Sequence, residues 1–292
     1  MNNNITRKVI FRIRDMFLPR HTGLEAQERI CAALESDEPI MIARFGAVEI
    51  KAVLYGILPP PINICLEKYV YRHMGQNAGF FPVNDLMLER FKDLMLRDMA
   101  DVDILASWRP EEIFFRKRMP EVYRIGLMDL QPHENSSFLW TMALKGKKVL
   151  VVHPFAETIK NQYKQNRTRI FKNPDILPEF ESLKTITAVQ SIAGNQTSFA
   201  NWFEALAWME EEIGRCEFDI ALIGCGAYGF PLAAYCKRIG KKAVHVGGAL
   251  QLLFGIKGKR WNNLSLYNEY WVSPSRKESP AGLHNVEGGC YW

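Results

Sequence analysis

The stretch that decides the fold is FDIALIGCGAYG, residues 218–229, together with KKAVHVGG, residues 241–248. An apolar run enters a glycine-rich turn, the turn leads into an apolar segment that reaches Lys237, and a second short apolar run follows. This order is typical of a strand, a helix and a second strand that pairs in parallel with the first. The C-terminal half is therefore predicted to contain a β-α-β unit.

Five further apolar runs have the length and boundaries of strands. They are residues 39–46, 101–108, 123–130, 147–155 and 183–191. Segments with helical spacing surround them, at residues 24–36, 47–57, 66–75, 84–99, 156–165 and 198–213. Strands that alternate with helices predict an α/β fold, with a mostly parallel, Rossmann-like sheet and helices on both faces.

The two ends of the chain differ from this pattern. Residues 5–18 combine apolar positions at helical spacing with four basic residues and predict a basic amphipathic helix. The residues beyond Gly258 have no sustained period but are rich in Trp and Tyr. We therefore divide the chain into an N-terminal helix (1–20), an α/β domain (21–258) and a C-terminal extension (259–292). We expect the extension to pack on the domain, either over a site or without a chemical role.

Composition narrows the classes of partner. The 37 Lys and Arg against 32 Asp and Glu give a charge of +5, which favours anionic ligands but lacks the basic stripe of a nucleic-acid-binding protein. Six cysteines contain no C-x-x-C pair, which disfavours a zinc site or a disulfide framework. The longest charge-free run, residues 220–236, is too short for a bilayer span. These features predict a cytoplasmic protein. Residues 5–18 could in addition hold it on the inner face of an anionic membrane, or simply dock on their own domain.

The glycine-rich turn carries the clearest ligand signal. Gly224, Gly226 and Gly229 match G-x-G-x-x-G between a strand and a helix, where backbone N–H groups and the positive helix end favour a phosphate. We expect Tyr228 to lie near the same ligand. The alternative is that these glycines only allow the strand and helix to pack closely. If the turn holds phosphate, a side chain at Gly226 should obstruct the ligand more than the fold.

A dinucleotide site also needs an acidic residue at the end of the next strand. No Asp or Glu occurs between Asp219 and Glu269, and His245 or its neighbours occupy that position. A Rossmann-type oxidoreductase or methyltransferase therefore remains only an alternative function.

An earlier strand ends in Arg44-Phe45-Gly46-Ala47-Val48-Glu49. This turn places a charged Arg at the strand end and Glu49 in the first turn of a helix. A carboxylate there could coordinate a metal, orient a sugar hydroxyl or complement the helix dipole.

Taken together, the R-F-G-x-x-E turn, the middle strand that enters a polar helix, and the glycine turn followed by a K-x-A-x-x-x-G strand resemble glycosyltransferases of the GT-D fold. The similarity covers roughly residues 38–262, including the aromatic, basic stretch at its end. It implies transfer of a sugar from a nucleotide-diphosphate donor to a glycan or glycolipid acceptor in bacterial surface-glycan synthesis. It also implies a divalent metal, Mn²⁺ or Mg²⁺.

The chain departs from the family in the first turn, which there reads R-F/Y-G-D-G-E. Ala47 stands in place of the Asp and Val48 in place of the second Gly, so Glu49 alone carries over as a metal ligand. Three interpretations stay open: a metal-independent relative, a branch with relocated ligands, and a non-catalytic homologue in a polysaccharide assembly complex.

The candidate site residues follow from these motifs and from the ends of the predicted strands. The candidates for the catalytic base are Glu49 and Asp129. The candidates for donor binding are Arg44, Phe45, Gly46, His153, Glu157, Gly224, Gly226, Tyr228, Gly229, His245, Gly247, Gly248 and Gln251.

Overall fold

The structure is a computed structural model that describes residues 12, 14–131 and 139–292. Within this range every predicted strand is present, and together they form one parallel, seven-stranded sheet. The strands are β1 (Met41–Ala43), β2 (Ile104–Ser107), β3 (Tyr123–Gly126), β4 (Lys148–His153), β5 (Ser182–Thr187), β6 (Ile220–Ile223) and β7 (Lys242–His245). The predicted α/β class with a parallel sheet is confirmed.

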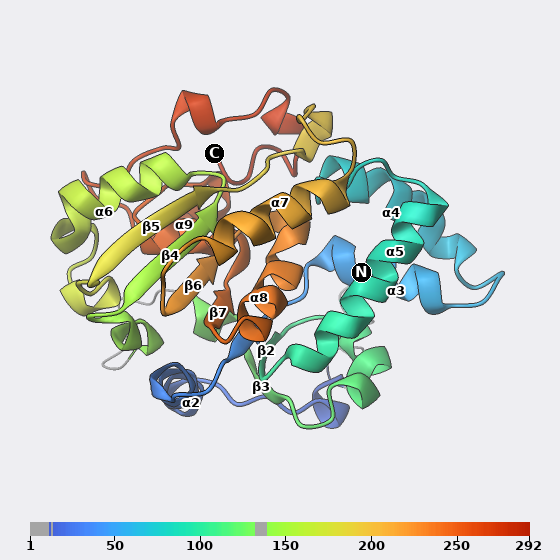
Figure 1. Cartoon of the computed structure of the whole chain (residues 1–292), viewed down its shortest axis with the longest axis horizontal. Coiled ribbons are helices and arrows are strands. Elements are labelled where there is room, and N and C mark those ends of the chain that lie inside the picture. Colours follow the sequence, from blue (N-terminus) through green and yellow to red (C-terminus); the bar gives the residue numbers. More distant parts are fainter. Residues whose placement is uncertain (1–11, 13, 132–138) are drawn as a thin grey trace.

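The sheet has the order β3-β2-β1-β7-β6-β4-β5 (Figure 1). The chain winds outward from β1 to β3, crosses to β4 and β5 at the far side, and fills the centre with β6 and β7. This reversal of winding places the carboxyl ends of β1, β7, β6 and β4 next to one another. In open α/β sheets, ligands bind at such points.

The five inner strands, β2, β1, β7, β6 and β4, are buried on both faces, which explains why the sequence shows continuous apolar runs there. The edge strand β5 differs, because Ile186 is its one buried residue. In β4, Leu150 and Val152 belong to one core cluster, whereas Val149 and Val151 belong to the other. Successive side chains of a strand point to opposite faces, so one run of four apolar residues supplies both cores. Full burial of each such side chain stabilises the fold by roughly 1.5–3 kcal/mol.

Helices cover both faces of the sheet (Figure 1). On one side lie α3 (Ala47–Ile57), α4 (Ile64–Gln76), α5 (Asp85–Asp98), α7 (Trp202–Gly214) and α8 (Gly229–Arg238). On the other lie α2 (Leu24–Glu35), α6 (Ala156–Ile170) and α9 (Leu250–Leu253). Short 3₁₀ helices connect these elements: η1 (Met99–Asp101), η2 (Pro110–Arg118), η3 (Leu127–Leu130), η4 (Trp140–Leu144), η5 (Pro174–Ile176), η6 (Ile192–Gly194), η7 (Gly226–Tyr228), η8 (Gly247–Ala249), η9 (Lys259–Leu264), η10 (Arg276–Glu278) and η11 (Leu283–Asn285).

The helix predicted at 198–213 begins four residues later, at Trp202. The reason is a cap at Asn201, whose side-chain oxygen accepts hydrogen bonds from the N–H groups of Phe203 and Glu204 at 3.0 and 3.1 Å. A side chain that satisfies these otherwise unpaired groups fixes the helix start.

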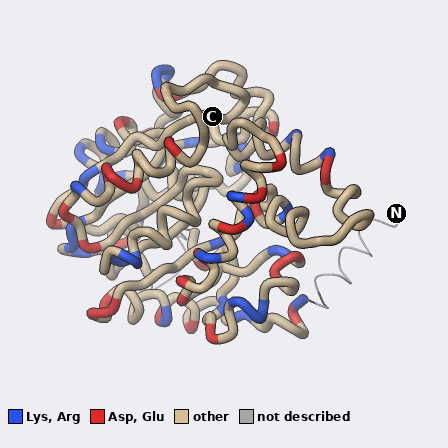
Figure 2. Tube along the Cα trace, turned by 45° about the vertical axis from the view of Figure 1, so that its right-hand side comes forward, with Lys and Arg blue, Asp and Glu red and all other residues tan. Residues whose placement is uncertain are grey.

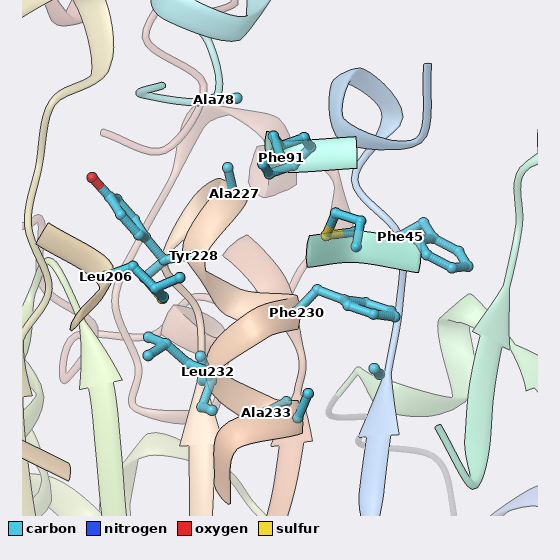
Figure 3. Packing of buried hydrophobic residues seen from close by; sticks show 14 of the residues in the cluster. Phe45, Ala78, Phe91, Leu206, Ala227, Tyr228, Phe230, Leu232 and Ala233 are labelled. Carbon is cyan, nitrogen blue, oxygen red and sulfur yellow. The ribbon is translucent and has the colours of Figure 1, made fainter. Parts of the chain in front are cut away.

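Aromatic packing locks α8 against its neighbours (Figure 3). Phe230 stacks on Phe45 with ring centroids 4.8 Å apart, and Tyr228 stacks on Trp202 at the same distance. These contacts fix the glycine turn that precedes α8 relative to the first strand-turn-helix.

The predicted helix at 5–18 falls mostly outside the described residues, although residues 14–17 are helical.

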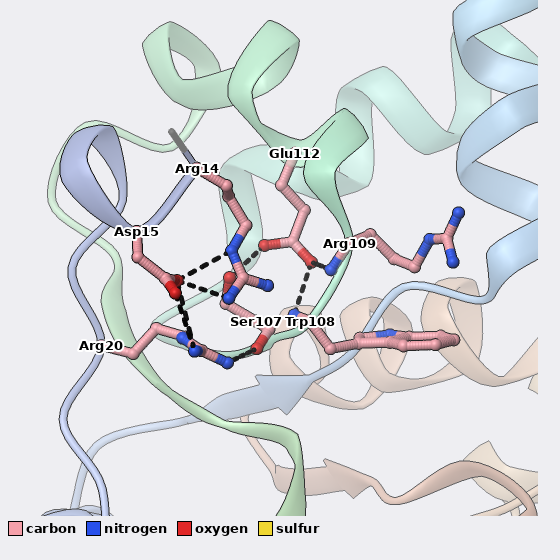
Figure 4. A network of polar contacts seen from close by, with 7 residues as sticks. All are labelled: Arg14, Asp15, Arg20, Ser107, Trp108, Arg109 and Glu112. Carbon is pink, nitrogen blue, oxygen red and sulfur yellow. Dashed lines mark hydrogen bonds and ion pairs between the residues drawn. The ribbon is translucent and has the colours of Figure 1, made fainter. Parts of the chain in front are cut away.

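The buried carboxylate of Glu112, in η2, connects segments that are distant in the sequence (Figure 4). Glu112 accepts hydrogen bonds from the Ser107 hydroxyl and from the backbone N–H groups of Trp108 and Arg109. Burial raises the pKa of Glu112, whereas these hydrogen bonds and, to a smaller extent, the charge of Arg14 lower it. This network holds the segment after β2 in place.

Figure 2 shows acidic and basic residues interspersed along the chain rather than gathered into one stripe. None of the described helices is long and apolar enough to cross a bilayer.

The C-terminal extension, red in Figure 1, runs across the top of that view between α6 and α4. Asn268 donates a hydrogen bond to the carbonyl of Ile170 in α6, and Gln76 in α4 donates one to the carbonyl of Asn285. The extension thus bridges helices that lie on opposite faces of the sheet.

Candidate functional site

A cavity of about 420 Å³ lies at the carboxyl edge of the sheet. Residues at or just after the carboxyl ends of all seven strands contribute to its lining, together with residues of the C-terminal extension. The main contributors are Arg44 and Glu49 after β1, Trp108 after β2, Leu127 after β3, His153 at the end of β4, Ser191 after β5, Gly226 after β6, His245 at the end of β7, and Arg260, Glu287 and Tyr291 from the extension.

Most of the predicted site residues meet in this cavity, although they come from distant parts of the sequence. Those that line it are Arg44, Gly46, Glu49, His153, Gly224, Gly226, Tyr228, His245, Gly247, Gly248 and Gln251. Phe45, Asp129, Glu157 and Gly229 are not among the lining residues.

Arg44 is held rigidly at the end of β1. Its Nε and Nη2 atoms donate to the carbonyl of Phe45 at 3.1 and 2.8 Å, and its guanidinium lies 5.0 Å from the ring centroid of Trp108. Trp108 donates to the same carbonyl at 2.8 Å. The backbone carbonyl of Phe45 therefore positions Arg44 and Trp108 at the site, while its ring packs in the core. Burial lowers the pKa of Arg44, which is opposed by the charge of Glu49 and reinforced by that of Arg260.

Glu49 lies over the N-terminus of α3. A Cβ atom built on Gly46 would be 1.8 Å from its Oε2 atom, so the carboxylate fills the space that a larger residue would need. Burial raises the pKa of Glu49, whereas hydrogen bonds from the backbone at Glu49 and Val48 and the charge of Arg44 lower it. The carboxyl group combines a raised pKa with a position in the cavity, as a catalytic base requires.

The three glycines of the second turn differ in role. A Cβ at Gly224 would be 2.7 Å from the carbonyl oxygen of Gly247, and one at Gly229 would be 2.1 Å from the ring of His245. These two glycines permit close packing, which is the alternative that the sequence left open. Gly226 is exposed toward the cavity.

Gly226 matters to the fold as well as to a ligand, contrary to the prediction from the sequence. Its φ of +59° lies in the left-handed region, and the nearest atom to an added Cβ is 3.4 Å away. A side chain there would strain the backbone by about 1–2 kcal/mol, so substitution harms the fold as well as the approach of a ligand. The hydroxyl oxygen of Tyr228 lies 3.4 Å from that of Ser191, and both residues line the cavity.

Two buried histidines flank the turn, at the ends of β4 and β7. Burial lowers the pKa of each to about 3, and for His245 the charge of Arg44 adds to this effect. Both rings are therefore neutral at physiological pH. His153 accepts a hydrogen bond from the N–H of Phe155 at its Nδ1 atom, 2.9 Å away, so its proton resides on Nε2. That N–H has no partner among the described residues and is available to a ligand in the cavity.

The segment after β7 joins the extension to the site. A Cβ at Gly247 would be 2.7 Å from Arg44 Nη1, and one at Gly248 would be 2.3 Å from the ring of Tyr291. Gln251 is fully buried and donates to the carbonyl of Tyr291 at 3.0 Å. These residues hold the extension in place above the sheet.

Arg260 is the main cavity residue that the sequence did not suggest. It forms an ion pair with Glu287, and its Nη1 atom donates to the hydroxyl of Tyr291 at 3.1 Å. Glu287 adopts a φ of +48°, which is unusual for a residue with a side chain. The available signals were the aromatic, basic stretch that ends near residue 262 and the density of Trp and Tyr beyond it. They do not identify which charged residue faces the cavity.

Two candidates lie elsewhere. Asp129 accepts a hydrogen bond from the N–H of Gly23 at 2.9 Å, and its backbone carbonyl accepts one from Gln27. It therefore fixes the start of α2 rather than facing the cavity. Glu157 is exposed, and its N–H donates to Glu278 at 2.9 Å, so a carboxylate of the extension caps α6.

The described residues do not fit the metal that the family resemblance implies. They include no group of three or more His, Cys, Asp or Glu side chains that could share an ion. Glu49 lies near the charge of Arg44, Glu287 pairs with Arg260, and Ala47 offers no ligand atom. The chemistry proposed below uses only side chains of the chain itself.

No family model and no curated protein matches the sequence. Two solved structures are similar to it, each covering 92% of this chain and 96% of its own, with a TM-score of 0.43. One, 13% identical, is a selenomethionine-substituted structure of domain of unknown function 1792. The other, 12% identical, is described with the words "the highly conserved domain of unknown function 1792 has a distinct glycosyltransferase fold". A likeness at this level assigns neither function nor site, which must be argued from the cavity itself.

Proposed function

We propose that the protein is a glycosyltransferase that binds the diphosphate of a nucleotide-sugar donor in this cavity. The observation that carries the proposal is the convergence of Arg44 and Arg260 on one cavity from opposite ends of the chain. The two guanidinium groups are close enough for the charge of Arg260 to lower the pKa of Arg44. An anion between them relieves this repulsion, and guanidinium groups match phosphate oxygens in geometry.

The location and size of the cavity support a small, anionic ligand. It lies at the carboxyl edge of a parallel sheet, beside the point where the winding reverses, and its volume is within the range of small-molecule sites. The turn at Gly226 adds N–H groups at the start of η7 and α8, which helices leave unpaired. His153 adds an uncharged donor.

In the proposed reaction, Glu49 takes the proton of an acceptor hydroxyl. The acceptor oxygen forms a bond to the anomeric carbon of the donor sugar, and the bond between that carbon and the diphosphate oxygen breaks. The diphosphate leaves with the electron pair, and Arg44 and Arg260 stabilise its charge. The raised pKa of Glu49 makes its carboxylate a stronger base than an ordinary glutamate.

The resemblance of residues 44–49 and of the glycine turn to the GT-D family supports the same chemistry. It extends the proposal to bacterial surface-glycan synthesis, with a glycan or glycolipid as the acceptor. In this setting residues 5–18 would hold a cytoplasmic enzyme on the inner face of the membrane, where lipid-linked acceptors are found.

Isothermal titration calorimetry with uridine, guanosine, adenosine and cytidine diphosphates tests the donor site. We expect at least one to bind, and Arg44→Gln to weaken it by about tenfold or more, because a charge-assisted contact to phosphate is lost. Arg116→Gln removes a matched, exposed arginine and should leave the affinity unchanged. Absence of binding to every diphosphate, or equal losses in both variants, would contradict the proposal.

A further inference from the structure

A second hollow of about 550 Å³ opens beside the cavity. We call it the amide groove. Its walls come from the end of α4, the phenylalanine pair after it, the loop at 191–199 that follows β5, and Asn285 of the C-terminal extension. None of the roles derived above uses it.

We propose that the amide groove binds an uncharged sugar of the acceptor and presents its hydroxyl to the donor cavity. This inference rests on the proposed glycosyltransferase function, because only a transfer reaction has an acceptor. The binding of a neutral sugar in the groove can nevertheless be measured by itself.

The amide groove lies directly beside the donor cavity. Three separate segments contribute one residue to the groove and the same or next residue to the donor cavity. Gln76 lines the groove and Asn77 the cavity, Ser191 lines both, and Asn285 lines the groove while Val286 lines the cavity. The two hollows are therefore separated by single layers of chain. A molecule bound in the groove therefore lies beside the cavity that Glu49 and the two arginines line.

The described lining of the groove is polar but uncharged. None of the described residues that line the groove is charged, although 69 of the 292 residues of the chain are Lys, Arg, Asp or Glu. Four carry side-chain amides: Gln76, Asn195, Gln196 and Asn285. An amide both donates and accepts hydrogen bonds, as a sugar hydroxyl does. An acidic or basic ligand would find no counter-charge here, whereas a neutral sugar would find matched partners.

Not all of these amides are engaged within the protein. The side chains of Gln196 and Asn285 make no hydrogen bond to other described residues and are exposed. The half-buried rings of Phe81 and Phe199 lie along the same groove and offer apolar surface for the C–H face of a sugar ring. Amides beside aromatic surface suit a carbohydrate better than an extended peptide, because no unpaired strand edge contributes to the lining.

The loop at 191–199 is held in a constrained backbone conformation. Ala193 has a φ of +57° and Gly194 one of +74°, and a left-handed alanine is uncommon. Asn195 stabilises this conformation with hydrogen bonds to the carbonyls of Ile192 at 2.7 Å and Ala281 at 2.9 Å. Strained backbone that its surroundings hold in place is found preferentially at binding sites.

The test is binding of the purified full-length protein to an array of neutral and anionic glycans, followed by titration with the strongest glycan. We expect neutral glycans to bind. The double variant Gln196→Ala, Asn285→Ala should bind at least about tenfold more weakly, since two side-chain hydrogen bonds are lost. Gln165→Ala removes an exposed glutamine of α6 as the matched control and should bind as the parent does.

A second arm separates the two proposals. Arg44→Gln should lose nucleoside diphosphate and keep the glycan, whereas the groove variant should show the reverse. Binding of no neutral glycan, a preference for anionic glycans, or equal binding by the parent and the groove variant would overturn the groove inference. If glycans bind as expected but no nucleoside diphosphate binds, the glycosyltransferase proposal fails while the groove remains a sugar site.

Discussion

The neutral state of His153 gives a prediction about stability and pH. The pKa of this histidine falls from an ordinary value of 6.5 to about 3 because the ring is buried. Below pH 6.5 the unfolded chain therefore binds a proton that the folded chain does not. Through His153 alone, the free energy of unfolding decreases as the pH falls, by about 1.4 kcal/mol per pH unit in the window between the two values. This is the reverse of a histidine stabilised by a carboxylate.

The magnitude follows from the two pKa values. Between pH 7 and pH 5 the contribution of His153 is a loss of about 2 kcal/mol. His153→Gln removes the titrating group, and the side-chain oxygen of glutamine can still accept the hydrogen bond from Phe155. The unfolding free energy of the variant should therefore fall by about 2 kcal/mol less than that of the parent over this range.

Urea denaturation at half-unit steps from pH 5 to pH 7 measures the difference between the two slopes. His284→Gln, at an exposed histidine, is the matched control and should retain the parental slope. Equal slopes for the parent and His153→Gln, or a His153 pKa near 6.5 by NMR titration, would refute the assignment of a neutral, buried donor.

Three further predictions concern the glycines and the N-terminus. Gly248→Ala should destabilise the fold by about 1–3 kcal/mol and speed proteolysis of the extension, because the ring of Tyr291 must move; parental stability would contradict this. Gly226→Ala should lower the free energy of unfolding, measured by urea denaturation, by about 1–2 kcal/mol and should also weaken nucleoside-diphosphate binding. Unchanged affinity would show that the glycine turn serves only packing. Deletion of residues 1–11 should reduce salt-sensitive sedimentation with anionic vesicles, and equal sedimentation would exclude a membrane role. A deletion that also removes Arg14 would confound this test, because its charge faces the buried Glu112.

The sequence predicted the five inner strands well because they are buried on both faces and so appear as apolar runs, whereas the edge strand β5 has one buried residue, Ile186. Their ends were less certain: the run predicted at 39–46 is hydrogen-bonded as a strand only at Met41–Ala43. Apolar residues continue into the turn because Phe45 packs in the core after the strand has ended. The order of strands in the sheet was not predictable from these patterns, since pairing depends on contacts between distant segments.

The site was partly predictable for a geometric reason. Parallel strands end at the same edge, so Arg44, His153, Gly226 and His245 were expected at one edge of the sheet, and the strand order β1-β7-β6-β4 then makes them neighbours. Side-chain direction was not predictable in the same way. Asp129 follows a strand as the others do, but it turns to the N–H of Gly23, a contact that spans 106 residues of sequence. Arg260 lies in a segment without periodicity, and only the folded extension brings it to the cavity.

The most direct test of the central claim is sugar transfer by Glu49→Gln, measured together with its melting temperature. Nucleoside-diphosphate release from a panel of nucleotide sugars, with a neutral glycan as acceptor, identifies the donor for the parent protein. The amide is nearly isosteric with the carboxyl group and cannot accept the proton. Transfer should therefore fall by about 10²-fold or more while the fold is retained.

Glu67→Gln, in the first turn of α4, is the matched control and should keep full activity. If Glu49 only complements the dipole of α3, its substitution should instead cost about 0.3–1 kcal/mol of stability and leave turnover intact. We predict the large loss of transfer with a melting temperature close to that of the parent. Full turnover by Glu49→Gln would contradict the proposed mechanism.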